Sequence, residues 1–570
     1  MSGPNGSNGH GGAAAGARRR VLVVGLDAAT FDLIMPWVDA GVLPTLARLI
    51  REGVRAPLRS TLPALTPPGW TSAATGRNPG KHNVFNFYRG RAGGLQPAPV
   101  TPGDLRSPRV WDIAAAQGRR SIVLRMPLTY PPQESVGVMV SGIMTPKGTE
   151  DFVAPASLKA VLEAKIPRYR MEVDAENLRQ GDLDTFRADA FDLQRVQTEE
   201  ALYLLQHEDW DLCWVMSHTL DKLQHFFWRY MDREHPAYPG PGPYEHTIRD
   251  FHVAFDQALA RYLEAIPPDT NVVLLSDHGS APLHTYFCVM NWLADERFMA
   301  LQGEGVARRG LAAVGVDAKT LVRRLKRVGL GWLPRLVPSS LKGQVPQALS
   351  SFSKIAGRID WSRTRAYCPS APGSGLWINL KGREPEGIVT PGAEYERVVA
   401  ELRERLLAYR DPKTGEAVVT AVHRREDIYH GPHAEGGPDL LVETGRTVCM
   451  IEGLGRKSLM PAGRGPEERT GNHARDGIFI AYGPDVRTGE RLETRAIEDV
   501  APTVLYLLGL PVDADMDGQV LAQALRPERL AAQPIVVNAE PYALPDTAAF
   551  QFSADDEQRI QDMLEGLGYV

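Results

Sequence analysis

Short apolar runs, separated by longer stretches of mixed polar and apolar residues, dominate the chain from residue 20 onward. Residues 21–26, 212–216, 272–275 and 478–482 are continuous runs of this kind. Runs of about four to eight apolar residues are typical of strands buried on both faces, as in parallel sheets covered by helices. Helix and strand patterns alternate along this part of the chain. We therefore predict an α/β fold with a doubly wound, mostly parallel sheet flanked by helices.

Polar side chains follow two of these runs directly. Asp27 follows the first run, and Ser276-Asp277-His278-Gly279 follows the third. Open α/β sheets build their sites at the carboxyl ends of the strands. Asp and His side chains together suit a divalent transition metal. These positions indicate a metal site, although Asp27 alone could equally cap the next helix.

A helix start carries a hydroxyl at Thr66. This residue precedes Pro67 and Pro68, and small helix-compatible residues follow them. Thr at the N-cap with Pro at the first helical position is a helix-start signature. A hydroxyl there faces free backbone N–H groups and the positive end of the helix dipole, which favours an alkoxide or a bound phosphate. The alternative is a Thr that only caps the helix.

Two further segments offer metal-type ligands. Asp221 and His225 follow the strand-like run 212–216 and are four residues apart, so they share one face of a helix. His473 lies in a Gly-flanked loop ahead of the run 478–482. Each signal alone has an ordinary explanation, a surface Asp–His pair or a loop histidine. Their order along the chain is what makes them informative.

As an ordered set, these segments resemble the alkaline phosphatase superfamily, and most of all its type I phosphodiesterase/nucleotide pyrophosphatase branch. The resemblance spans roughly residues 20–525 and includes bacterial phosphohydrolase- and phosphomutase-like proteins of this superfamily. It implies an alkaline-phosphatase-like fold and two divalent metal ions, zinc first, with manganese or iron as alternatives. One ion would be held by Asp27, Asp277, His278 and the hydroxyl of Thr66, and the other by Asp221, His225 and His473.

The same resemblance implies a role for Thr66 as the nucleophile of a double displacement through a phospho-enzyme intermediate. Asn86 lies near the register of an Asn that helps to hold the phosphate in the diesterase branch. Sulfatases of the superfamily carry Cys or Ser as the nucleophile with a following Arg. Thr66, with Gly69 and Trp70 after it, departs from that pattern.

The predicted function is that of a metal-dependent phosphohydrolase, a phosphodiesterase acting on a small-molecule or lipid-like phosphate ester. One alternative is a phosphomonoesterase or phosphomutase, which would need Lys222, His284 or Arg77 to grip a dianionic phosphate or return it to product. A second alternative, from another class, is an inactive anion-binding scaffold.

Composition limits the partners and the cellular compartment that we expect for this protein. The chain is 43% hydrophobic and 23% charged, and its net charge of −5 leaves no overall footprint for nucleic acid. Its four cysteines are scattered without a CxxC pair, which favours a reducing compartment and a cytoplasmic location. No apolar run approaches the ~18 residues of a transmembrane helix.

Shifts in composition divide the chain into five parts. We expect a disordered tail (1–18), a first part of the catalytic core (19–296), a helical basic insertion or lid (297–360), a second part of the core (361–525) and a C-terminal tail (526–570). Basic residues interleave with apolar ones within the insertion, so residues 310–345 could touch an anionic membrane or form a solvated lid. The sequence leaves the oligomeric state open.

Overall fold

A ten-stranded sheet organises the chain. The computed structural model describes residues 19–89, 98–302, 357–369, 375–451, 453–454, 457–465, 467–544 and 550–566. The strand order is β18-β2-β17-β7-β1-β6-β3-β4-β5, and β19 also pairs with β2. The bounds are β1 Val21–Leu26, β2 Val54–Arg59, β3 Ser121–Leu124, β4 Gly137–Val140, β5 Val153–Ala154, β6 Leu212–Ser217, β7 Asn271–Leu275, β17 Asp476–Tyr482, β18 Glu490–Arg491 and β19 Arg495–Ala496.

The five strands in the middle of the sheet, β7-β1-β6-β3-β4, are all parallel. Antiparallel strands flank them, with β17 against β7 on one side and β5 against β4 on the other. Strand β1 lies between β6 and β7, with Gly25 opposite Met216 and Leu275. The sheet is therefore mixed and mostly parallel, as predicted.

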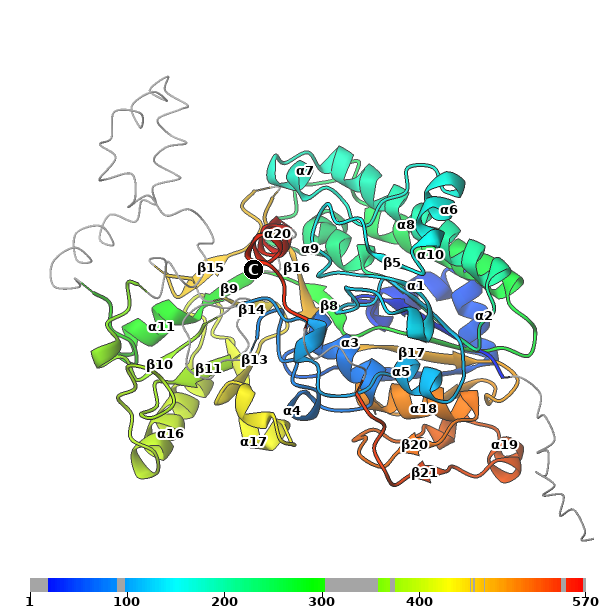
Figure 1. The fold of residues 1–570 in the computed structure, drawn as a ribbon. Helices are drawn as coiled ribbons and strands as arrows, with labels where there is room; N and C mark the ends of the chain where they lie inside the picture. The colour runs from blue at the N-terminus through cyan, green and yellow to red at the C-terminus, as the bar shows by residue number, and fades with distance from the viewer. Residues whose placement is uncertain are drawn as a thin grey trace, which may run out of the picture.

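Helices cover both faces of this sheet (Figure 1). Successive residues of β1 face opposite sides, so that Leu22 and Val24 join one hydrophobic core and Val21 and Val23 the other. The first core includes α1 Phe31–Asp39, α2 Pro44–Glu52, α8 Leu183–His207, α9 Thr219–Met231 and α10 Thr247–Ala265. The second includes α3 Thr66–Thr75, α5 Val110–Ala116 and α18 Val500–Leu508. Two covered faces make the fold doubly wound, which confirms the prediction.

A smaller lobe with its own core forms between β8 (Gly279–Pro282) and β16 (Gly471–Ala474), which pair with each other. It holds a four-stranded sheet of order β10-β11-β13-β12 and a three-stranded sheet of order β14-β9-β15. Its elements are β9 Thr285–Cys288, α11 Val289–Asp295, β10 Ala366–Tyr367, β11 Gly375–Ile378, α16 Ala393–Ala408, β12 Val419–Arg424, α17 Arg425–Ile428, β13 Leu440–Thr444, β14 Val448–Ile451 and β15 Leu459–Pro461.

This lobe contains two apolar runs of the expected second part of the core, at 375–379 and 438–442. They overlap β11 and β13, which pair with each other rather than with the central sheet. The chain rejoins the central sheet at β17. Most of the predicted insertion, including residues 310–345, lies outside the described residues, as does the tail 1–18. The division into five parts stays a prediction.

Additional short helices complete the fold: α4 Pro79–His82, α6 Ser157–Lys165, α7 Ala175–Arg179, α19 Pro527–Ala532 and α20 Ala554–Gly566. Near the end of the chain, Phe552, Ile560 and Leu564 are buried in the first core. Within the described ranges, no helix by itself has the length and apolar character to cross a membrane; α1 and α2 meet that test only as a pair, bent by 101°.

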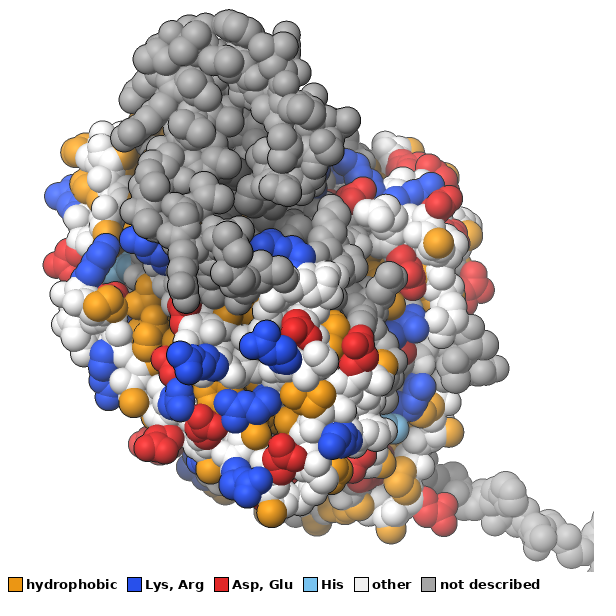
Figure 2. Space-filling view, turned by 90° about the vertical axis from the view of Figure 1, so that its left-hand side faces the viewer, with side chains coloured by type: hydrophobic (Ala, Val, Ile, Leu, Met, Phe, Trp, Pro, Cys, Tyr) orange, Lys and Arg blue, Asp and Glu red, His pale blue; other side chains and the backbone are white. Residues whose placement is uncertain are grey.

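Charged side chains of both signs are interspersed on the face of the molecule that Figure 2 shows. Basic and acidic residues alternate there with hydrophobic ones, so neither sign gathers over the described part of that face. A protein that binds the phosphate backbone of a nucleic acid presents a basic stripe or patch instead. The described part of this face shows no such stripe or patch.

Candidate metal centre

Three strand ends bring the predicted ligands to one edge of the sheet. Asp27 comes directly after β1, and Asp277 and His278 come just after β7. Helix α9, which carries Asp221, begins two residues after β6 ends. Because β1 lies between β6 and β7, the carboxyl ends of these strands are neighbours.

The first cluster of ligands consists of Asp221, His225 and His473. The Oδ1 atom of Asp221 lies 3.2 Å from Nε2 of His225 and 3.4 Å from Nε2 of His473. The two Nε2 atoms are 3.1 Å apart. His473 reaches the other two from β16 rather than from a loop, because residues 471–474 pair with β8 directly after His278. One helix turn and one distant strand thus supply a three-ligand group.

A second cluster consists of Asp27, Asp221 and His278, whose ligand atoms all lie within 4.8 Å of one another. Nε2 of His278 is 3.5 Å from Oδ1 of Asp27 and 3.4 Å from Oδ2 of Asp277. Asp221 therefore belongs to both clusters, and Asp277 adjoins the second one through His278. All six Asp and His residues predicted as ligands come together.

The three histidines present the same ring nitrogen to the centre. Nδ1 of each ring faces a backbone carbonyl: Gly471 for His225 at 3.1 Å, Gly279 for His278 at 3.0 Å, and Ala64 for His473 at 2.8 Å. We assign the proton of each ring to Nδ1, because a carbonyl oxygen can only accept. Each Nε2 then carries the lone pair and faces the centre, which is the arrangement of a ligating imidazole oriented by a second partner.

Burial and mutual repulsion act on the carboxyl groups of the centre. Burial raises the pKa of Asp27 well above its usual range, and the charges of Asp277 and Asp221 raise it further. Burial raises the pKa of Asp277 to about 6. Burial also lowers the pKa of all three histidines, which favours their neutral form. Neutral imidazoles beside crowded carboxylates need a cation to balance them.

Several polar atoms of the centre are buried and lack hydrogen-bond partners, as expected of metal ligands. Both carboxylate oxygens of Asp27 and of Asp277, Nε2 of His278 and Oγ1 of Thr66 are buried without a hydrogen-bond partner in the described part of the chain. Buried polar atoms are normally satisfied, so a group of unsatisfied ones calls for an explanation. Carboxylate, imidazole and hydroxyl donors fit divalent transition metals. The residues present therefore fit a two-metal centre.

Thr66 lies fully buried at the start of α3. The N-cap is Leu65, so Thr66 is the first helical residue, one place later than the predicted cap. The contacts on either side of Thr66 lead to the centre: Ala64 accepts a hydrogen bond from His473, and a Cβ added to Gly69 would lie 3.1 Å from Cβ of Asp277. The positive end of α3 is therefore packed against the clustered ligands.

Two residues that the sequence did not indicate also support the centre. Oγ of Ser276 accepts a hydrogen bond from the N–H of Ala29 at 2.9 Å and so ties the loop after Asp27 to the end of β7. Nη2 of Arg469 lies 2.8 Å from Nε2 of His225. Ser276 precedes Asp277 directly, so it could have been proposed from its position. Nothing in the pattern around Arg469 distinguishes it from the chain's other arginines.

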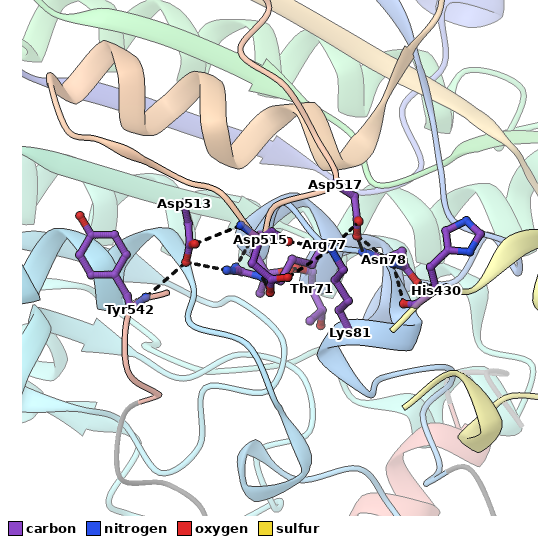
Figure 3. Close-up of polar contacts among 10 residues, drawn as sticks. Thr71, Arg77, Asn78, Lys81, His430, Asp513, Asp515, Asp517 and Tyr542 are labelled. Atoms are coloured by element: carbon purple, nitrogen blue, oxygen red, sulfur yellow. Dashed lines mark hydrogen bonds and ion pairs between the residues drawn. The ribbon is translucent and has the colours of Figure 1, made fainter. Parts of the chain in front are cut away.

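Arg77, a candidate for the phosphomonoesterase alternative, lies in a separate polar network at the other end of α3 (Figure 3). Its Nη2 is 2.7 Å from a carboxylate oxygen of Asp513, and its Nε is 3.0 Å from one of Asp515. In the same network Asp517 accepts hydrogen bonds from Asn78. A ten-residue helix is about 15 Å long. Arg77 therefore stands well away from Thr66.

The other candidates have partners of their own. Lys222 forms an ion pair with Glu172, and the ring of His284 packs edge-on against that of His235 at 5.0 Å. Oδ1 of Asn86 accepts a hydrogen bond from the N–H of Phe87 at 2.6 Å. A role for Asn86 in holding phosphate stays a prediction.

Comparison with known proteins agrees with this architecture. The profile of the type I phosphodiesterase / nucleotide pyrophosphatase family matches residues 21–457. No curated protein matches the chain. Phosphonoacetate hydrolase from Sinorhizobium meliloti 1021, solved with phosphonoformate, is 17% identical with a TM-score of 0.51, over 86% of this chain and 95% of that one. At this identity the likeness shows a shared fold.

Ectonucleotide pyrophosphatase / phosphodiesterase 5 is also among the similar structures. The murine protein is 11% identical with a TM-score of 0.45, over 89% of this chain and 100% of that one. The human protein is 12% identical with a TM-score of 0.45, over 89% and 98%. The family profile covers well over half of the 570 residues. The chain belongs to the type I phosphodiesterase/nucleotide pyrophosphatase family, in the alkaline phosphatase superfamily.

Proposed function

We propose that this protein is a two-metal phosphodiesterase in which Thr66 is the nucleophile. The observation that carries the proposal is the convergence of Asp27, Asp221 and Asp277 with three histidines whose Nε2 atoms face the same centre. Family membership supports the class of reaction. An inactive anion-binding scaffold would not explain why the carboxylates of Asp27 and Asp277 are buried without hydrogen-bond partners among the described residues.

Two divalent ions, when bound, would neutralise charge on the attacking and leaving oxygens of an in-line displacement. The chain's own contribution begins at Thr66, whose Oγ1 is held at the positive end of α3, where backbone N–H groups favour an anionic oxygen. The hydroxyl loses its proton, and its oxygen forms a bond to phosphorus while the bond to the leaving alkoxide breaks; the alkoxide takes up a proton and leaves as the alcohol. Water then displaces Thr66 from the phosphoryl group, which returns one proton to the Thr66 oxygen and releases a phosphate monoester.

Residues around the nucleophile fix its geometry. The N–H of Gly69 donates to the carbonyl of Leu65 at 2.9 Å, so the first turn of α3 is closed. The indole of Trp70 packs on β1 so closely that a Cβ at Gly25 would lie 2.5 Å from its ring. A helix pinned at its start positions Thr66 at no further entropic cost when substrate binds.

The donor set favours zinc. Three carboxylates, three imidazoles and one hydroxyl divide into two sites of three or four ligands, which is the coordination that zinc adopts in proteins. Manganese and iron accept the same ligands and are the alternatives. Elemental analysis of protein purified without chelators would identify the ion, and we expect two ions per chain.

Turnover of two aryl esters tests the reaction. We expect the metal-loaded protein to hydrolyse bis(p-nitrophenyl) phosphate with a higher kcat/KM than p-nitrophenyl phosphate. Thr66→Ala should abolish this turnover, whereas Thr71→Ala, a buried change on the same helix, serves as the matched control. A dominant rate on the monoester would favour the phosphomonoesterase alternative. Purified protein without tightly bound ions and without turnover would favour the scaffold.

A further inference from the structure

A second candidate binding site lies outside the metal centre. A cavity of about 580 Å³ is bounded by β2, by the start of β17 and by the start of α1. None of the seven residues assigned to the metal centre lines it. Its polar lining is dominated by five arginines: Arg55, Arg59, Arg446, Arg475 and Arg491. Cavities of this size hold small organic ligands.

Three of these arginines are balanced by the three acidic residues of the lining. Asp32, Glu443 and Asp476 each take one arginine as partner. Arg446 pairs with Asp32, and Arg475 pairs with Glu443 at 3.1 Å. Arg59 pairs with Asp476, and Nη2 of Arg59 lies 3.2 Å from Oδ2 of Asp476. Every carboxylate of the cavity is thus already engaged.

The other two arginines, Arg55 and Arg491, form no ion pair with any residue that the structure describes. Nη1 of Arg55 is 3.1 Å from Sδ of Met35, a weak acceptor. Arg491 is exposed on β18, which pairs with β2 so that Arg491 lies directly beside Arg55. Two neighbouring guanidinium groups without carboxylates repel each other unless an anion stands between them. The cavity therefore carries an unbalanced positive charge.

The remaining lining limits the kind of anion. Phe31, Met35 and Pro57 form an apolar wall beside the arginines. Thr30, the N-cap of the nine-residue helix α1, also lines the cavity, so the positive end of that helix adds to the field. Guanidinium groups bind phosphate through paired hydrogen bonds. An apolar wall next to them suits a ligand with an organic part rather than inorganic phosphate alone.

We propose that this cavity binds the phosphate monoester group of a small organic molecule, such as a nucleoside monophosphate, at a site separate from the metal centre. Arg55 and Arg491 contact the phosphate, and the apolar wall contacts the organic part. The two sites share one segment of chain, because Ala474 and Arg475 line the cavity directly after His473. Binding at the cavity needs no metal ion.

Calorimetric titration of the full-length protein with AMP tests this site. The protein is first freed of divalent ions by chelation, so that the metal centre does not contribute. We expect AMP to bind, inorganic phosphate to bind at least about tenfold more weakly for want of the apolar contact, and adenosine to bind at least about a hundredfold more weakly for want of the charge. Binding of AMP that disappears on chelation would overturn the proposal.

Two substitutions locate the site. Arg55→Met keeps a side chain against Met35 but removes the charge, and Arg491→Met does the same on the exposed strand. Each change should weaken AMP binding about tenfold. Arg363→Met, at an arginine whose side chain is 74% exposed in the smaller lobe, is the matched control and should change nothing. If Arg55→Met impairs folding, Arg491→Met still tests the site, because Arg491 is exposed. Unchanged affinity of Arg491→Met for AMP would refute the proposed site.

Discussion

Asp221 is the one carboxylate that belongs to both ligand clusters, so replacing it should weaken both metal sites together. Its Oδ1 atom contacts His225 and His473, and its ligand atom also lies within 4.8 Å of those of Asp27 and His278. Asp221→Asn keeps the shape of the side chain and removes one negative charge. By contrast, His473→Ala should weaken one site and spare the other.

The magnitude follows from Coulomb's law. At a separation of about 4 Å, the attraction between a carboxylate and a divalent cation is about 8 kcal/mol with an effective dielectric constant of about 20. If desolvation and relaxation offset half of this, a loss of more than two orders of magnitude in affinity remains for each ion. We therefore expect Asp221→Asn to retain fewer than one ion per chain after dialysis, against two for the wild type.

The stability of the metal-free protein should depend on Asp221 much less than that of the metal-loaded protein does. The charge of Asp221 is one cause of the raised pKa of Asp27 and of Asp277. Removing that charge relieves repulsion, but it also removes the contacts with His225 and His473 that hold the pKa of Asp221 well below its usual range despite its burial. The melting temperature of chelated Asp221→Asn should therefore differ from that of the chelated wild type much less than the zinc-loaded proteins differ from each other. Elemental analysis and thermal melts with and without zinc measure both effects. Asp39→Asn, an exposed change on α1, is the control. Two ions retained at wild-type affinity, or the loss of only one, would refute the reasoning.

Three additional predictions concern α3 and its surroundings. Thr66→Ala should lower turnover by about a thousandfold or more while both ions stay bound, as elemental analysis would show, because the other ligands are carboxylates and imidazoles. Arg77→Met should destabilise the protein by about 3–5 kcal/mol, measured by unfolding in urea, because Asp513 is left buried without its partner. Burial lowers the pKa of His82 from 6.5 to about 3, so the stability that depends on its neutral ring is present above pH 6.5 and is lost as the pH falls. The melting temperature of His82→Gln should therefore fall less steeply between pH 6.5 and 5 than that of the wild type, where this residue contributes at most about 1.4 kcal/mol per pH unit.

Each of these three has a distinct check. Loss of metal in Thr66→Ala would show that its hydroxyl is a main metal ligand, and the lost turnover would then not identify Thr66 as the nucleophile. The double variant Arg77→Met/Asp513→Asn should recover part of the lost stability, and no recovery would mean that the ion pair is not the cause. Identical pH profiles for the wild type and His82→Gln would show that folding does not lower the pKa of this ring.

Local patterns were enough to predict the parts of the site that depend on neighbours in the sequence. Asp27 follows six apolar residues directly, so both β1 and the polar group at its end could be predicted. The same holds for Asp277 and His278 after β7. The spacing of Asp221 and His225 predicted one face of one helix, and α9 confirms it.

Features that depend on distant pairing could not be predicted. That Asp221 lies between two clusters depends on where α9 starts relative to β1, and spacing along the chain carries no such information. His473 forms part of a strand because β8 offers it an edge, about 190 residues away in the sequence. The apolar runs at 375–379 and 438–442 overlap β11 and β13, and their pairing with each other decides which sheet they join. The cap of α3 moved by one residue because Leu65 has the extended backbone that a cap needs.

The pairing of β8 with β16 has a consequence for how this protein could diversify. The chain leaves the core through β8 and returns through β16, and these two strands lie side by side. Everything between them can therefore be lengthened, shortened or exchanged while the chain still re-enters at the same place. His278, just before the exit, and His473, at the return, would keep their positions. Evolution can thus remodel the outer lobe without moving the two histidines that flank it.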